Sequence, residues 1–311
     1  MHRWYYRRIF PNDRFGWGIP NRQLFSRMIK FGLGYLFVII GGRLAFQSDN
    51  LVVGLLYGGV KTSIYYTTQM PAFLLIALIW MIADNAGPAI NELYARKNIG
   101  QLTDSYIRLL KYSLLLGFSL ALGLLVFNRN MVTLWVGAEQ YAGNVMTISL
   151  AVFTVATVAN HVNAIIMVAN GALKYLSAVS IFGGIANLIL SLILGKTIGI
   201  EGVMVASAIV EVVVMVMFET YCLRLMNISL VYLWRKSIMP AITTNCFVIP
   251  VVVYALMGNI SANLLSFIVW LLIFTFIIFI GTVTTGLNKS EFRDIHNYFG
   301  GFISKLYRTS I

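Results

Sequence analysis

The sequence predicts an all-α membrane protein that crosses the bilayer several times. Of its 311 residues, 59% are hydrophobic and only 11% are charged, and the mean hydropathy is +0.81. A soluble domain carries about 25% charged residues and could not hide this much apolar surface from water. The apolar residues also gather in runs of about 20, the length that spans a bilayer as a helix. The surplus apolar surface is therefore expected to face lipid.

Eight apolar runs are the predicted spans. They are too long and too even for the strands of a membrane barrel, which are about 10 residues long and alternate in polarity. Helices remain, because backbone groups in lipid must be hydrogen-bonded within their own segment. The predicted spans cover residues 31–48, 65–91, 107–127, 144–168, 174–195, 201–223, 239–257 and 262–285.

The basic residues predict the orientation. The net charge is +12, but the lysines and arginines cluster in short breaks between the apolar runs, which is the pattern of membrane topology and not of nucleic-acid binding. With the N-terminus inside, 19 bases lie on the inner side, and the outer loops hold three: Lys61, Arg129 and Lys196. Both termini are therefore predicted to be cytoplasmic, with basic segments that contact anionic phospholipid head groups.

Two charged residues stand in the first span, in "GGRLAFQSDN" (41–50). A charge near the bilayer centre costs from about 2.5 to more than 10 kcal/mol. Arg43 is expected in the outer half of the membrane, where it either extends toward the outer surface or faces a cavity and contacts an anion. Asp49 is expected at the outer rim and partly solvated, either as a polar helix end or as a functional group.

The second span ends in "WMIADNAGPAINEL", in which Asp84 precedes a Gly-Pro pair. Pro88 removes a helical hydrogen bond, so a kink is expected here. Asp84 could bind a cation or carry a proton beside this kink, or it could pair with a neighbouring helix for packing. Whether Asp84 meets Arg43 depends on the register of the two antiparallel helices and stays open.

Polar residues also occur within the fourth and sixth spans. Asn160 and Asn163 share one helical face, whereas His161 lies off that face. His161 could relay protons near neutral pH or form one interhelical hydrogen bond. Glu211 lies deep in the sixth span, where it could couple to protons or bond a neighbouring helix. Asp49, Asp84, His161 and Glu211 are therefore the candidates for ion coupling.

The sequence carries no enzyme signature. Its three histidines, His2, His161 and His296, do not have the spacing of a metal site, and no nucleotide-binding loop or nucleophile motif occurs. Neither an enzyme nor a metal or cofactor is therefore expected. A helical bundle with scattered internal polar groups is typical of a secondary transporter.

Four stretches carry a family resemblance. They are "LVVGLLYGGVKTSIYYTTQMP", "GPAINELYARKNIGQL", "MVTLWVGAEQYAGNVMTISL" and "GALKYLSAVSIFGGIANLILSLILGKTIGIEGVMVASAIVEV". Their order and spacing resemble the C-terminal half of polysaccharide-biosynthesis (Wzx-type, O-antigen or capsule) flippases of the MOP exporter superfamily. The resemblance covers residues 28–225 well and the last two spans less well.

The resemblance implies a function and a location. Members of this family move oligosaccharides linked to undecaprenyl pyrophosphate across the bacterial plasma membrane by alternating access between two lobes. In this chain, Arg43 would face the cavity and suit the pyrophosphate, and Asn160 and Asn163 join it as candidates for substrate binding. The first six family helices are absent, so a separate N-terminal lobe or self-association would have to complete the transporter.

The implied organisation has five parts. They are a basic cytoplasmic linker (1–30), a six-helix lobe (31–225), an interfacial segment (226–238), two further transmembrane helices (239–285) and a cytoplasmic tail (286–311). Other functions stay open: a MATE-like cation or drug exporter, a polymerase or acyltransferase of the same pathway, or a nonfunctional fragment. The membrane enzymes would need paired arginines or a histidine in an outer loop, and these loops carry three bases and no histidine.

Overall fold

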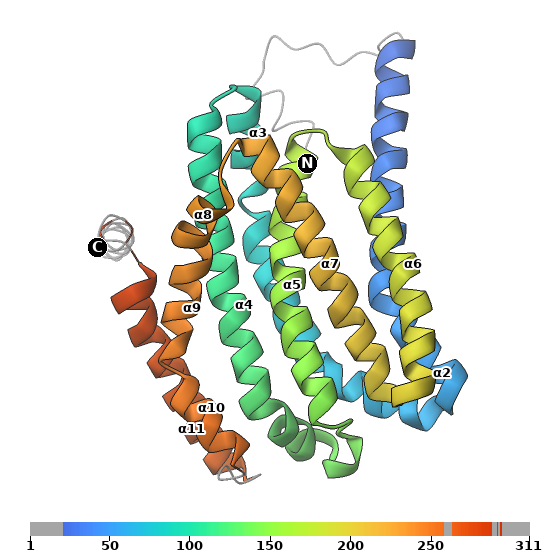
Figure 1. Ribbon diagram of the computed structural model, residues 1–311, viewed down its shortest axis with the longest axis vertical. Coiled ribbons are helices and arrows are strands. Elements are labelled where there is room, and N and C mark those ends of the chain that lie inside the picture. The colour runs from blue at the N-terminus through green and yellow to red at the C-terminus, as the bar shows by residue number, and fades with distance from the viewer. Residues whose placement is uncertain (1–20, 258–262, 288–290, 292, 294–311) are drawn as a thin grey trace, which may run out of the picture.

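The computed structural model describes residues 21–257, 263–287, 291 and 293. The regular structure of these residues is helical, and none of them lies in a strand. The helices run up and down as an antiparallel bundle (Figure 1). The all-α membrane fold is therefore confirmed. Most of the basic N-terminal segment and most of the C-terminal tail, with His2 and His296, lie outside the described residues.

The first long helix, α2 (Arg22–Asp84), folds back on itself at Gly58, whose φ of 79° and ψ of 179° are not helical. Only glycine adopts this backbone conformation readily. Tyr65 bonds Asp49 and Gln69 bonds Asn50, although a straight helix would separate the first pair by about 24 Å. The element therefore consists of a first leg (22–57) and a second leg (59–84), which correspond to the first two predicted spans (Figure 1).

The predicted kink is confirmed, because the helix is interrupted just before Pro88. A two-residue turn separates α2 from α3 (Gly87–Ala95), and Pro88 lies at the start of α3, where its missing N–H does no harm. Then follow α4 (Ile99–Val136), the 3₁₀ turn η1 (Ala138–Gln140) and α5 (Asn144–Ala169). The α5 helix ends beside Gly171, which has a φ of 72°.

Helices α6 (Leu173–Ile198) and α7 (Ile200–Met226) form a tight hairpin around Gly199. The first leg of α2 packs closely against α6 through two glycines. A Cβ atom on Gly41 would lie 2.4 Å from the backbone carbon of Ser180, and one on Gly184 would lie 2.8 Å from the carbonyl oxygen of Gly41. Small residues of this kind let membrane helices approach closely, and here they bring the polar groups of α6 next to those of α2.

The C-terminal part lies along α4, on the side away from α5 (Figure 1). It contains α8 (Leu230–Leu233), the π-helical turn η2 (Trp234–Ile238), α9 (Met239–Cys246), α10 (Ile249–Leu256), α11 (Leu264–Gly281) and the π-helical turn η3 (Thr282–Gly286). The Phe274 ring of α11 meets the Phe127 ring of α4 edge to face, with centroids 5.3 Å apart. Beyond η3, Glu291 is buried and its carboxylate lies 2.5 Å from Nζ of Lys111 on α4.

The number of spans agrees with a polytopic protein. Within the described ranges, six helices are long and apolar enough to cross a membrane, or seven if the pair 230–246 and 249–256, bent by 53°, forms one span. This count takes residues 22–95 as a single helix. Because α2 reverses at Gly58, counting its two legs separately gives seven crossings, or eight if the bent pair forms one span.

Candidate functional site

Arg43 lines a cavity of about 770 Å³ that opens between the two legs of α2. Gln47, Asn50 and Gln69 add polar groups to it, and Phe46, Phe73 and Trp80 add aromatic faces. Arg43 is exposed and forms no hydrogen bond or ion pair with any residue that the structure describes. Oε1 of the buried Gln69 is also without a partner there. This cavity therefore offers a free cation and a free acceptor to a polar ligand.

Asp49 is the centre of a buried hydrogen-bond cluster, and only 4% of its surface is exposed. The Tyr65 hydroxyl donates to Oδ2 over 3.1 Å, and the Ser207 hydroxyl donates to the same atom over 2.5 Å. The Asn187 amide donates to Oδ1 over 3.0 Å, and Ser191 adds a longer contact of 3.4 Å. These donors come from the second leg of α2, from α6 and from α7, so one carboxylate joins three helical segments to the first leg.

The expectation that Asp49 is a partly solvated group at the membrane rim is wrong. The close approach of Gly41 and Gly184 brings α6 over Asp49 and removes it from water. No cationic side chain of the described residues pairs with Asp49. Its neighbours are instead neutral side chains that carry oxygen atoms, and the Asn187 amide oxygen accepts a hydrogen bond from Ser207. Such a set of oxygens suits a hard cation.

Two further carboxylates of α7 bond to the asparagines of α5. Glu211 is buried, and the Asn160 amide donates to its Oε2 over 2.5 Å and to its backbone oxygen over 3.1 Å. Glu219 lies two turns further on and accepts bonds from Asn163 at 2.9 Å and from Tyr106 at 3.1 Å. The shared face predicted for Asn160 and Asn163 is thus the face that α5 turns toward α7.

His161 lies off that face, as predicted, and bonds Asp84. Its Nε2 atom lies 2.8 Å from Oδ1 of Asp84, and its ring stacks on Trp80 with centroids 4.6 Å apart. The question left open by the sequence is thereby answered, because Asp84 meets His161 and not Arg43. The pair joins the end of α2 to the middle of α5.

The structure does not bring all the predicted residues into one site. Arg43 lines the open cavity, whereas Asn160 bonds Glu211 inside the bundle and Asn163 is fully buried against Glu219 and Tyr106. The sequence analysis did not identify the hydrogen-bond partners of these groups, which are Tyr65, Tyr106, Asn187, Ser191, Ser207 and Glu219. A signal for some of them was present: Asn187 and Ser191 are four residues apart in an apolar span, and so are Ser207 and Glu211.

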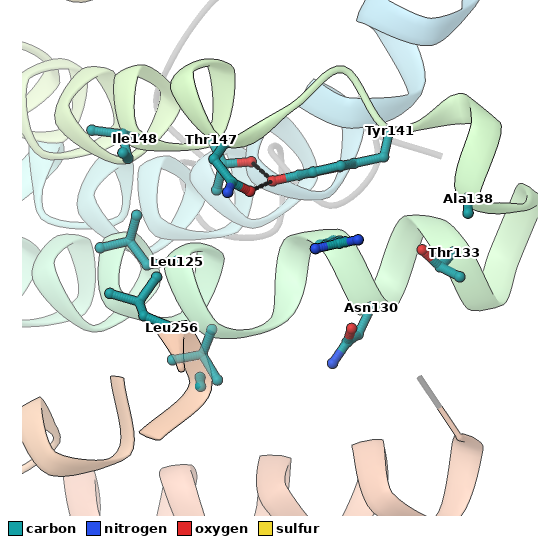
Figure 2. Close-up of a pocket in the computed structure, with 12 residues that line it drawn as sticks. Leu125, Asn130, Thr133, Ala138, Tyr141, Thr147, Ile148 and Leu256 are labelled. Atoms are coloured by element: carbon teal, nitrogen blue, oxygen red, sulfur yellow. Dashed lines mark hydrogen bonds between the residues drawn. The ribbon is translucent and has the colours of Figure 1, made fainter. Parts of the chain in front are cut away.

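A second open cavity, of about 440 Å³, lies at the predicted outer end, between α4, η1, α5 and α10 (Figure 2). Figure 2 shows Tyr141 reaching across to Thr147; the Tyr141 hydroxyl lies 2.9 Å from the Thr147 hydroxyl and donates to Asn144 over 2.9 Å. Burial raises the pKa of Tyr141 above its usual value, so this hydroxyl remains a donor. The polar groups of this cavity largely satisfy one another, although Arg129 also lines it.

Comparisons with known proteins give no assignment: no protein-family model, no curated protein and no solved structure matches this chain. Within the described part of the chain, no three His, Cys, Asp or Glu side chains are grouped as a metal site would require. A function for the site therefore rests on the chemistry of its own residues.

Proposed function

We propose that this chain is one lobe of a transporter that moves an oligosaccharide linked to undecaprenyl pyrophosphate across the bacterial plasma membrane for surface polysaccharide synthesis. The observation that carries this proposal is the open cavity between the legs of α2, with Arg43 unpaired among the described residues. A polar wall at membrane depth is costly if lipid covers it. It is favourable where a charged substrate passes.

Each part of the cavity matches one part of such a substrate. The planar guanidinium of Arg43 suits the oxygens of a pyrophosphate, which it can bind with two parallel hydrogen bonds. The amides of Gln47, Asn50 and Gln69 suit sugar hydroxyls. A cation exporter of the MATE type fits less well, since Arg43 would repel its cargo.

A second set of helices would complete the transporter. The cavity is open on the side that the legs of α2 leave uncovered, and alternating access needs a second wall that moves against the first. A separate N-terminal lobe or a second copy of this chain would supply that wall.

The Asp49 cluster is proposed as the coupling site. Its oxygens come from segments on both sides of the Gly58 reversal and from α6 and α7, so an ion bound there would hold these segments together. Sodium or a proton could supply the positive charge that the described side chains do not. Binding and release of this ion would then change the packing of the cavity wall.

Replacement of Arg43 by glutamine tests the proposal. A charge-assisted hydrogen bond is worth about 1.5–3 kcal/mol, so R43Q is expected to weaken binding of undecaprenyl pyrophosphate to the purified full chain by about tenfold or more. Arg129→Gln is the matched control, because Arg129 is also exposed but lines the other cavity. In cells that lack their own matching flippase, R43Q should also lower any surface polymer that the wild-type chain restores. Equal binding by wild type and R43Q would contradict the proposal.

A further inference from the structure

A third cavity lies inside the bundle, and it carries chemistry that the proposed function does not use. It has a volume of about 210 Å³ and is lined by both legs of α2 and by α5, α6 and α7. Its polar lining residues are Thr157, Asn160, His161, Ser180 and Glu211. It borders the open Arg43 cavity, because Gly42, Phe46 and Trp80 line both.

Two buried polar atoms of the residues around this cavity have no hydrogen-bond partner in the part of the chain that the structure describes. They are Oδ1 of Asn160, a residue only 7% exposed, and Nε1 of Trp80. One is an acceptor and the other is a donor. Buried polar groups in proteins nearly always have partners, and internal water supplies those that the protein does not. A water molecule occupies about 30 Å³ in the liquid, so this cavity has room for several.

The carboxylate of Glu211 is poorly compensated compared with that of Asp49. It is 7% exposed, and the Asn160 amide is its only side-chain donor among the described residues, whereas Asp49 has four. No described cation pairs with it. A buried carboxylate in this position is most stable with a proton bound or with water around it. The cavity has room for that water.

The His161–Asp84 pair connects this cavity with the outside. The side chain of His161 is 22% exposed and lines the cavity, and the side chain of Asp84 is 59% exposed. An imidazole can accept a proton on one ring nitrogen and release one from the other. Asp84 holds the ring by the bond to Nε2.

We propose that Glu211 is a proton-exchange site that is distinct from the Asp49 cluster and reaches solvent through cavity water and the His161–Asp84 pair. A proton from solvent binds one ring nitrogen of His161, the other nitrogen releases one to cavity water, and the Glu211 carboxylate takes it up. The ring is left neutral as its other tautomer, and its return to the first tautomer completes the cycle, so the net change is one proton moved from solvent to Glu211.

The charged and titratable groups near this path come from four of the five segments. They are Glu211 on α7, His161 on α5, Asp84 on the second leg, and Arg43 and Asp49 on the first leg; α6 contributes only the Ser180 hydroxyl. Ser207, which donates to Asp49, precedes Glu211 by one helical turn. Protonation of Glu211 would therefore remove a negative charge near Asp49 and weaken the binding of a cation there.

Infrared spectroscopy of the reconstituted full chain tests the site without requiring transport. On acidification, the wild-type protein should show a C=O band of a protonated carboxylic acid that is missing from the spectrum of Glu211→Gln, beside the bands of the other carboxyl groups that both proteins share. Glu219→Gln is the matched control, because Glu219 lies on the same helix but is held by Asn163 and Tyr106 outside this cavity. That variant should keep the band. Identical acidification spectra of the wild type and E211Q, in protein that remains monodisperse, would overturn the assignment.

A second measurement tests the route. On transfer to D2O the band should shift quickly in the wild type, and His161→Gln, which cannot relay a proton, should slow this shift by at least about tenfold. Equal rates in both proteins would overturn the role of His161. Because these readouts report proton binding alone, their failure would leave the proposed substrate untouched, and failure of R43Q would leave this site untouched.

Discussion

Asp49 shows how a single carboxylate joins several helices of the bundle. Four donors from three segments converge on its two oxygens, and none of them carries a positive charge. The hydroxyls of Tyr65, Ser191 and Ser207 can rotate, so their oxygens can face either the carboxylate or a cation placed beside it. A carboxylate held in this way has its charge spread over four hydrogen bonds and has no cationic partner among the described residues.

Replacement of Asp49 by asparagine should therefore destabilise the fold and remove ion sensitivity. The amide NH2 faces donors that a carboxylate oxygen accepted, and leaving them unpaired costs about 1–3 kcal/mol. We expect D49N to lower the free energy of unfolding in detergent by about 2 kcal/mol, and sodium should stabilise the wild type but not the variant. The exposed Asp104 gives the control, Asp104→Asn, which should do neither. A sodium effect that survives in D49N would place the ion elsewhere.

The sequence predicted that Glu211, Asn160 and His161 are polar groups within the spans, because each interrupts an apolar run, but it placed Asp49 in partial contact with water, whereas Asp49 is buried. It could not predict their partners. The bond from Asn160 to Glu211 depends on the rotation of α5 against α7, and the bond from Asn187 to Asp49 depends on a close approach that only the folded pair of glycines allows. Both bonds depend on how the helices pack, which the sequence of a single segment does not determine.

At the scale of elements, the contact between the first leg of α2 and α6 sets the position of the Asp49 donors. Gly41 and Gly42 are adjacent, yet only the first touches α6. A Cβ on Gly41 would meet the Ser180 backbone at 2.4 Å, whereas a Cβ on Gly42 would meet nothing within 4 Å. The two glycines thus form a natural pair of test and control.

Gly41→Ala is expected to separate the helices and lower the free energy of unfolding by about 1–3 kcal/mol, the usual cost of overpacking. It should also lengthen the bond from Asn187 to Asp49 and weaken the sodium effect. Gly42→Ala should be neutral or slightly stabilising, since alanine is the better helix former. Chemical denaturation of the two variants in one detergent measures this difference, and equal stabilities would contradict the packing described above.

The helical spans were predicted well because hydropathy and turn residues report on single segments. The reversal between the first two spans is the instructive case. It needs only Gly58 in a conformation that glycine favours, so the helix on each side continues up to the reversal without a longer loop. The five-residue π-helical turn η2, which connects α8 to α9, was not predicted, because a π-helical turn has no clear sequence pattern.

For the whole molecule, the three basic residues that were assigned to the outer loops lie at one end of the bundle. The reversal at Gly58, the η1 loop and the α6–α7 turn lie at one end, which carries Lys61, Arg129 and Lys196, and the connections before α4 and α6 and after α7 lie at the other (Figure 1). The depth of a residue can therefore be estimated from its distance to these turns. Gln47 lies 11 residues before Gly58, and Ile189 lies 10 residues before Gly199, so the two are at similar depth.

These two positions test whether the open face of the lobe is wet. Gln47 lines the Arg43 cavity, whereas Ile189 is an exposed apolar residue of α6 that suits lipid contact. In a background with Cys222 and Cys246 replaced by alanine, Gln47→Cys should react with a charged thiol reagent added in water, because the reactive thiolate forms only where water reaches it. Ile189→Cys should stay unmodified in the same vesicles. If both cysteines were protected, lipid or protein would cover the cavity, and a charged substrate could not reach Arg43 by this route. Reaction of Gln47→Cys alone would mean that one face of α2 borders water at membrane depth, which is the condition that both Arg43 and a transported pyrophosphate require.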